Sequence, residues 1–162
     1  MNSTNYKEMI SNYQELEMID NCPVLKEIFN ESQLREIKWG IEKNLDVSHY
    51  ADSKYTWRQM RQIRFGLEDN LDISQYTNPK FSGKQMEQIR WGLLYNLDVS
   101  VYANPKYNYK QMEEIRMGLF KNLDVSQYAD PKYKWYQMLI KRFELLEEKE
   151  KEEQEEKERG KK

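Results

Sequence analysis

The sequence predicts an all-α fold, a short α-solenoid of helix–short-helix repeats with capping helices. Three observations predict it. A 26-residue unit recurs along the chain, its first half has the apolar spacing of an amphipathic helix, and its second half carries signals for a short helix and a proline turn. Such a unit cannot bury its apolar face alone, so neighbouring copies are expected to stack. The clearest marker of the repeat is a glutamine: Gln33, Gln59, Gln85, Gln111 and Gln137.

The repeating unit reads Gln-Met-x-x-Ile-Arg-x-Gly-Leu-x-x-Asn-Leu-Asp-Val-Ser-x-Tyr-Ala-x-Pro-Lys-Tyr. A fifth copy begins at Gln137 and then breaks off. The chain therefore divides into N-terminal capping helices, four helical repeats, and a C-terminal partial repeat with a charged helical tail. These parts cover residues 1–32, 33–136 and 137–162, and the four copies cover 33–58, 59–84, 85–110 and 111–136.

The first half of each copy is predicted to be a long amphipathic helix. In the second copy, Met60, Ile63, Leu67 and Leu71 have the spacing of one helical face. A residue that favours the N-cap stands three positions before the repeated glutamine, which predicts a capping box. The boxes are Thr56 with Gln59, Ser82 with Gln85 and Asn108 with Gln111. We therefore favour a structural role for this glutamine over contact with a ligand.

The second half is predicted to form a short helix that ends before a proline turn. A repeated aspartate is placed to cap it, and a repeated aromatic residue before the next long helix is placed as a hydrophobic staple. A repeated glycine inside the long helix costs about 1 kcal/mol relative to alanine, which we explain by the close approach of a neighbouring helix or tyrosine ring. These columns are Asp46, Asp72, Asp98 and Asp124; Tyr55, Phe81, Tyr107 and Tyr133; and Gly40, Gly66, Gly92 and Gly118.

Both ends of the chain are expected to act as caps. Residues 6–29 form a helix-rich stretch around Met9, Tyr13, Leu16 and Ile19, with a turn at Cys22 and Pro23. After Leu146 the chain becomes a run of Glu and Lys that is expected to be helical and solvated. It lacks the sustained apolar positions of a coiled coil, so we interpret it as a solubilising extension.

Composition narrows the class of protein. The formal net charge is −2, without the basic excess that phosphate neutralisation requires, so nucleic acid is disfavoured as a partner. With a single cysteine no internal disulfide can form, which fits a reducing compartment. The first residues carry no apolar segment typical of a secretory signal, and no apolar run is long enough to span a membrane. These features predict a cytoplasmic protein without a membrane segment.

The repeat resembles a known type of sequence. The stretches from Gln85 to Leu93 and from Asn96 to Tyr107 are similar to 26-residue tandem helical repeats found in Firmicutes, phage and mobile-element proteins of unassigned function. The resemblance covers residues 33–138. It implies a phage or mobile-element protein in a bacterial host cell, one that acts against host defence.

The search for catalytic chemistry is negative. His49 is the sole histidine, and other copies carry glutamine or valine at its position. One histidine and one cysteine supply too few ligands for a soft metal site. No phosphate-binding glycine loop or nucleophile motif is present. We therefore expect no enzyme, no metal and no cofactor.

Two sets of residues remain as binding candidates. Large apolar residues lie opposite the helix's own buried stripe in all four copies, and in copies three and four Leu94, Tyr95 and Phe120 extend this sector where earlier copies carry charged residues. This predicts a partner-binding surface formed by Trp39, Phe65, Trp91, Leu94, Tyr95, Met117 and Phe120. For Trp39 and Phe65, packing between repeats is equally favoured. The second set, Arg64, Arg90, Arg116, Lys80 and Lys106, could hold an anion through ladders of basic side chains.

The leading expectation is a non-enzymatic repeat protein that binds a protein partner, or a second copy of itself, through the outer helix face. The alternative is a sponge that sequesters an anionic small molecule such as a nucleotide immune signal. For the arginines, the structural interpretation is that each pairs with a nearby repeated aspartate, and we favour it over anion binding.

Overall fold

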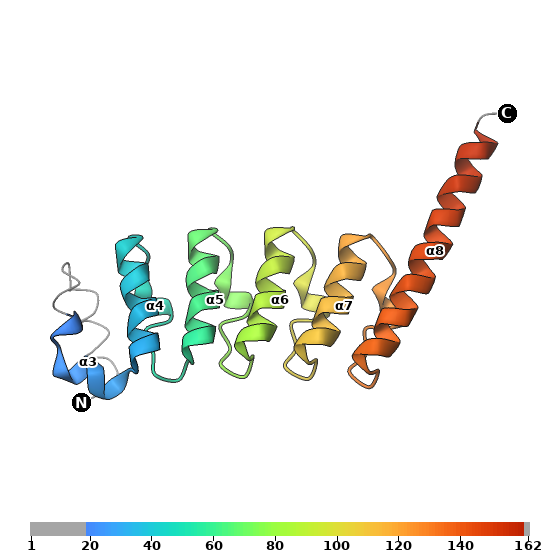
Figure 1. Cartoon of the computed structure of the whole chain (residues 1–162). Helices are drawn as coiled ribbons and strands as arrows, with labels where there is room; N and C mark the ends of the chain where they lie inside the picture. Colours follow the sequence, from blue (N-terminus) through green and yellow to red (C-terminus); the bar gives the residue numbers. More distant parts are fainter. Residues whose placement is uncertain (1–18, 161–162) are drawn as a thin grey trace. The chain divides into compact units, whose positions relative to one another are not determined.

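The computed structural model describes residues 19–160. These residues are helical, without β-strands, and the all-α prediction is confirmed for this range (Figure 1). The α-helices are α3 (Pro23–Ile28), α4 (Glu31–Glu42), α5 (Trp57–Glu68), α6 (Gly83–Leu94), α7 (Tyr109–Phe120) and α8 (Trp135–Arg159). Between them lie the 3-10 helices η1 (Val47–His49), η2 (Ile73–Gln75), η3 (Val99–Val101) and η4 (Val125–Gln127).

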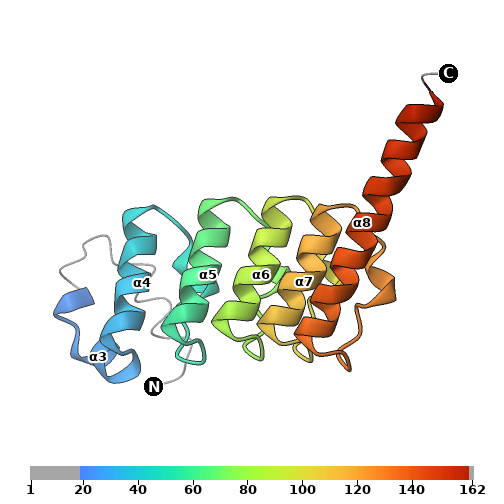
Figure 2. The ribbon, with the colours of Figure 1, turned by 45° about the vertical axis from the view of Figure 1, so that its right-hand side comes forward.

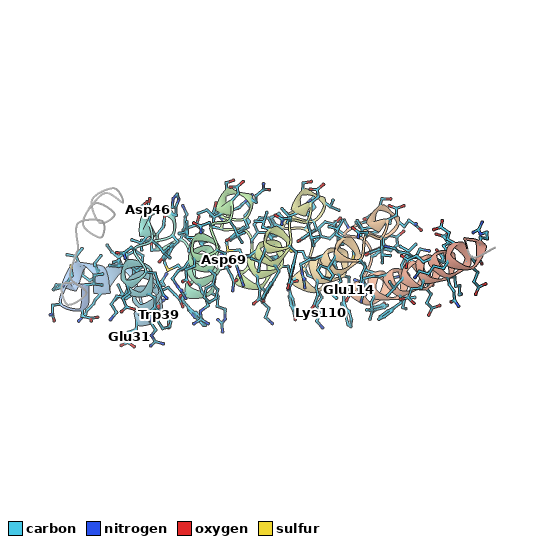
Figure 3. All side chains as sticks on the ribbon, turned by 90° about the horizontal axis from the view of Figure 1, so that it is seen from above. Glu31, Trp39, Asp46, Asp69, Lys110 and Glu114 are labelled. Carbon is cyan, nitrogen blue, oxygen red and sulfur yellow. The ribbon has the colours of Figure 1, made fainter. Side chains whose placement is uncertain are left out.

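The chain forms two compact units, Met1–Arg90 and Trp91–Lys162, which divide within α6. In the first unit α4 packs against α5, and in the second α7 packs against α8, as the views of Figures 1 and 2 both show. In the first unit Trp39 of α4 and Asp46 at the start of η1 lie on opposite faces (Figure 3). The helix-and-short-helix organisation of each copy thus matches the sequence prediction.

The ends of the long helices are satisfied by side chains and by a special backbone conformation. The predicted capping boxes are present at Thr56, Ser82 and Asn108. At the C-terminal ends, a repeated asparagine adopts the left-handed conformation, which asparagine tolerates better than most residues. The N–H of the following leucine then donates to a carbonyl five residues earlier, as from Leu45 to Gly40 at 2.9 Å. These asparagines are Asn44, Asn70, Asn96 and Asn122.

A tyrosine from each 3-10 helix segment forms the centre of the core. The Tyr50 hydroxyl donates to the Glu36 carbonyl at 3.0 Å, and that of Tyr128 to the Glu114 carbonyl at 3.2 Å. This hydroxyl occupies the space that a Cβ on the repeated glycine would need. The glycine prediction is therefore confirmed, with a tyrosine as the close neighbour. The fully buried tyrosines are Tyr50, Tyr76, Tyr102 and Tyr128, joined in the core by methionine and isoleucine of the long helices.

The repeated aspartates cap the 3-10 helices, as predicted. Asp46 accepts from the Ser48 N–H at 3.0 Å, and Asp124 accepts from the Ser126 N–H at 3.2 Å. Hydrogen bonds from these serines hold the pKa values of both carboxyl groups below the usual range. The short helix predicted from the Leu-Asp-Val-Ser pattern is thus a 3-10 helix.

The two ends add to the repeats differently. Ile19 and Leu25 are buried in the first unit, and α3 begins at Pro23. The predicted helical residues Met9, Tyr13 and Leu16 lie outside the described residues. The run of Glu and Lys after Leu146 is helical to Arg159, as predicted, and α8 projects beyond α7 (Figures 1 and 2). Among residues 19–160, no helix is long and apolar enough to cross a membrane.

Candidate protein-interaction surface

Five apolar residues of the second unit form an outer apolar cluster. Leu94, Tyr95 and Phe120 are 38%, 47% and 47% exposed, and the other two are half-buried. The Tyr95 ring stacks on Trp91 at 6.0 Å between centroids and meets the edge of Phe120 at 5.2 Å. The structure thus brings three predicted aromatic residues into contact and leaves two of them, Tyr95 and Phe120, nearly half open to solvent. The cluster consists of Trp91, Leu94, Tyr95, Met117 and Phe120.

The helices place this cluster opposite the core. In α7, Met112 and Ile115 are fully buried, whereas Met117 and Phe120 lie on the outer side of the helix. Tyr95 directly follows α6 and is held there by its backbone N–H, which donates to the Trp91 carbonyl at 3.2 Å. Because the backbone below the cluster is regular helix and capped turn, the side chains form a preorganised surface.

The two predicted residues of the first unit have different surroundings. The Arg64 guanidinium lies 5.3 Å from the Trp39 ring centroid and 4.6 Å from that of Phe65. Arg90 lies 5.2 Å from Phe65 as well. Cationic side chains therefore cover part of both rings. This arrangement favours a packing role for Phe65, the alternative that the sequence left open, whereas Trp39 remains 37% exposed, nearly as much as Leu94 of the outer apolar cluster.

The repeated arginines join neighbouring long helices within each unit. Arg64 Nε donates to Glu36 Oε2 at 3.1 Å, and a second guanidinium nitrogen pairs with Glu68. Arg142 Nε donates in the same way to Glu114 Oε2 at 2.9 Å. The acceptor lies 28 residues before the arginine, on the preceding long helix. The prediction that these arginines pair with the repeated aspartates is therefore wrong, because those aspartates cap the 3-10 helices.

The basic residues predicted to bind an anionic ligand do not form an open binding site in the structure. Arg64 and Arg90 are buried; Arg90 Nε donates to the Gln62 side chain at 3.1 Å, and its guanidinium also pairs with Asp69. Lys80 and Lys106 are exposed residues of turns. Arg116 is half-buried in α7. An anion would have to displace Glu36 or Asp69 to reach the buried guanidinium groups, at a large electrostatic cost.

Two features escaped sequence reasoning. The repeated glutamine does more than complete the capping box: its Nε2 donates to the carbonyl before the next long helix, from Gln33 to Tyr55 at 2.7 Å and from Gln111 to Tyr133 at 2.6 Å. In addition, α8 carries exposed apolar residues. Phe143 occupies the position of Met117 one repeat later, and counting 26 residues onward would have found it.

Comparisons with protein-family models, with curated proteins and with solved structures give no match. Within residues 19–160, no group of three or more His, Cys, Asp or Glu side chains could hold a metal ion. The candidate site is therefore defined by its own geometry: a solvent-exposed apolar surface on rigid helices.

Proposed function

We propose that this chain is a non-enzymatic helical-repeat protein that binds a partner protein through the outer apolar cluster. The observation that carries the proposal is the exposure of Tyr95 and Phe120, two aromatic rings in mutual contact and each nearly half open to solvent. Contiguous apolar surface of this kind marks sites of protein interaction, and aromatic residues dominate the binding energy of such sites.

The difference between copies supports the assignment. At the positions of Leu94 and Tyr95, the second copy carries Glu68 and Asp69, which pair with arginines in the first unit. In the third copy apolar residues replace these charges. A position that the scaffold fills with charge in one copy does not need an apolar side chain for folding, so the change serves another purpose.

The proposed architecture is a short α-solenoid. Two kinds of hydrogen bond support it because they recur in both units: arginine to Glu or Gln of the preceding long helix, and glutamine to the carbonyl before the next one. Each copy thus carries a donor and an acceptor for its neighbours, which is how repeat proteins propagate.

The partner class follows from the resemblance of the repeats to those of phage and mobile-element proteins. It supports a partner in the cytoplasm of a bacterial host, in its defence machinery. A sponge for an anionic nucleotide signal is less well supported, because Arg64 and Arg90 are committed to pairs inside the protein.

The proposal is tested with substitutions in the outer apolar cluster, one of which introduces residues that another copy of the repeat carries at the same positions. The variants are Leu94→Glu with Tyr95→Asp, which copies the second repeat, and Phe120→Ser. The control is Gln127→Ser, an exposed position on η4. Each is used as bait in bacterial lysate, and retained proteins are purified and titrated by calorimetry. We expect binding to the wild type and the control only. Equal binding by all four proteins, or no binding by any, would overturn the proposal.

A further inference from the structure

Helix α8 presents an exposed apolar stripe on the side opposite the one that packs on α7. Tyr136, Ile140 and Phe143 are 51%, 57% and 50% exposed, and the Arg142 guanidinium lies 4.6 Å from the Phe143 ring centroid, so that one face of this ring is covered. Their spacing of four and then three residues places them within about 60° of one another around the helix. Met138, Arg142 and Leu145 form the buried side of the same helix. None of the stripe residues belongs to the outer apolar cluster.

The repeat shows what this side of a long helix does. Ile140 stands 26 residues after Glu114, and Glu114 is the side chain of α7 that receives Arg142 when α8 packs against it. In the first unit Glu36 receives Arg64 of the next helix in the same way. At the position of Ile140 this side is therefore a docking side for a following helix, whereas Phe143 holds the position of Met117 at its outer edge. In α8 an isoleucine replaces the acceptor, so the surface fits an apolar helix rather than another arginine-bearing repeat.

We propose that the occupant is α8 of a second copy of this chain, packed antiparallel. The stripe continues to Glu147 with the spacing of 4, 3 and 4 residues that coiled-coil seams use. In an antiparallel pair, Ile140 faces Phe143 of the second copy and Tyr136 faces Glu147 of the second copy, so that its hydroxyl can donate to the carboxylate. A two-fold axis makes each contact twice, as in isologous dimers.

Charge selects the antiparallel direction. Residues 147–158 of α8 contain eight Glu and three Lys, whereas Lys132 and Lys134 lie at the start of the helix. Both lysines are exposed, and Lys132 also pairs with Asp130 at 2.8 Å. An antiparallel pair brings Glu147 and Glu148 of one copy toward Lys134 of the other. A parallel pair would align the two acidic segments and repel. The charged end of α8, expected from sequence to be a solubilising tail, thereby sets the direction of pairing.

Mass in solution tests the dimer. Light scattering is measured at protein concentrations up to about 1 mM, since a stripe of this size makes a weak interface. We expect the wild type to approach twice 19.8 kDa. Ile140→Glu should halve that mass, while Phe120→Ser, which removes a similarly exposed aromatic ring outside the stripe, should leave it doubled. Circular dichroism confirms folding of each variant. A wild type at single mass, or an Ile140→Glu variant at double mass, overturns the proposal.

Crosslinking tests the direction. In a Cys22→Ser background, one chain carries Tyr136→Cys and another Glu147→Cys, and the two are mixed under oxidation. The antiparallel pair predicts disulfides between the two different chains in preference to disulfides between like chains. Crosslinks confined to like chains would show parallel pairing and would overturn the antiparallel arrangement.

Discussion

Arg142 and Glu114 meet at 2.9 Å between α8 and α7, with side chains that are only 11% and 10% exposed. The same contact joins Arg64 to Glu36 within the first unit, whereas Arg90 donates instead to the neutral Gln62. Charged and neutral acceptors therefore serve at one position. The hydrogen bond from arginine Nε recurs in each case, and it fixes how far each long helix is displaced relative to the preceding one.

Removing the Glu114 carboxylate tests how much its contact with Arg142 stabilises the fold. Glu114→Ala leaves the Arg142 guanidinium buried without its partner, and we expect a loss of about 3 kcal/mol in the free energy of unfolding. Glu114→Gln is the matched control, because it keeps an acceptor as Gln62 does in the first unit. Urea unfolding followed by circular dichroism measures both. Equal losses for the two variants would show that charge, not the hydrogen bond, stabilises the contact.

The repeated glycine allows a double-mutant cycle. A Cβ at Gly118 would overlap the Tyr128 hydroxyl, so Gly118→Ala should destabilise by about 2 kcal/mol although alanine favours helix. In a Tyr128→Phe background the clashing oxygen is gone, and the same substitution should cost at least about 1 kcal/mol less. Strictly additive effects in urea unfolding would contradict this account of the glycine.

The elements were predictable because their signals are local. Thr56 and Gln59 are three residues apart, and Asp46 caps a helix that begins at the next residue, so short-range rules found both. The contact between Arg64 and Glu36 spans 28 residues and depends on the offset between helices, which periodicity does not contain. The arginine's involvement in an ion pair was therefore foreseen, but its partner was not.

The outer surface was predictable in part. Tyr95 and Phe120 stood out because they replace charged residues, and their exposure agrees with that expectation. Phe65 carries the same kind of side chain, but arginines lie over its ring, and this depends on rotamers that a repeat alignment does not give. Ile140 was missed because the Glu and Lys composition that follows it masked the apolar spacing in α8.

The buried tyrosines predict sensitivity to alkali. Burial raises the pKa values of Tyr50, Tyr76, Tyr102 and Tyr128 above the ordinary value. Tyrosines of the unfolded chain ionise near about pH 10, so above that pH the folded state holds protons that the unfolded state releases. The contribution of these groups is thus fully present below this pH. Above it, stability falls by up to about 1.4 kcal/mol per pH unit for each tyrosine.

Urea unfolding across this pH range measures that slope. Tyr128→Phe should lower the free energy of unfolding near neutral pH, because a buried hydrogen bond is lost. Above about pH 10 its free energy of unfolding should fall less steeply with pH, because one proton fewer is released on unfolding. An unchanged slope in this variant would mean that Tyr128 is not responsible for the decline.

Two substitutions in α7 separate binding from packing at the outer apolar cluster. Because Phe120 is nearly half exposed and its main ring contact is the edge-to-face pair with Tyr95, Phe120→Ser should cost only about 1 kcal/mol in the free energy of unfolding. Ile115, which is 0% exposed in the same helix, is the control, and Ile115→Ala should cost about 3 kcal/mol. Urea unfolding measures both. If Phe120→Ser lowered the free energy of unfolding as much as Ile115→Ala, the cluster would stabilise the fold as core residues do. Its exposure would then no longer indicate a binding surface.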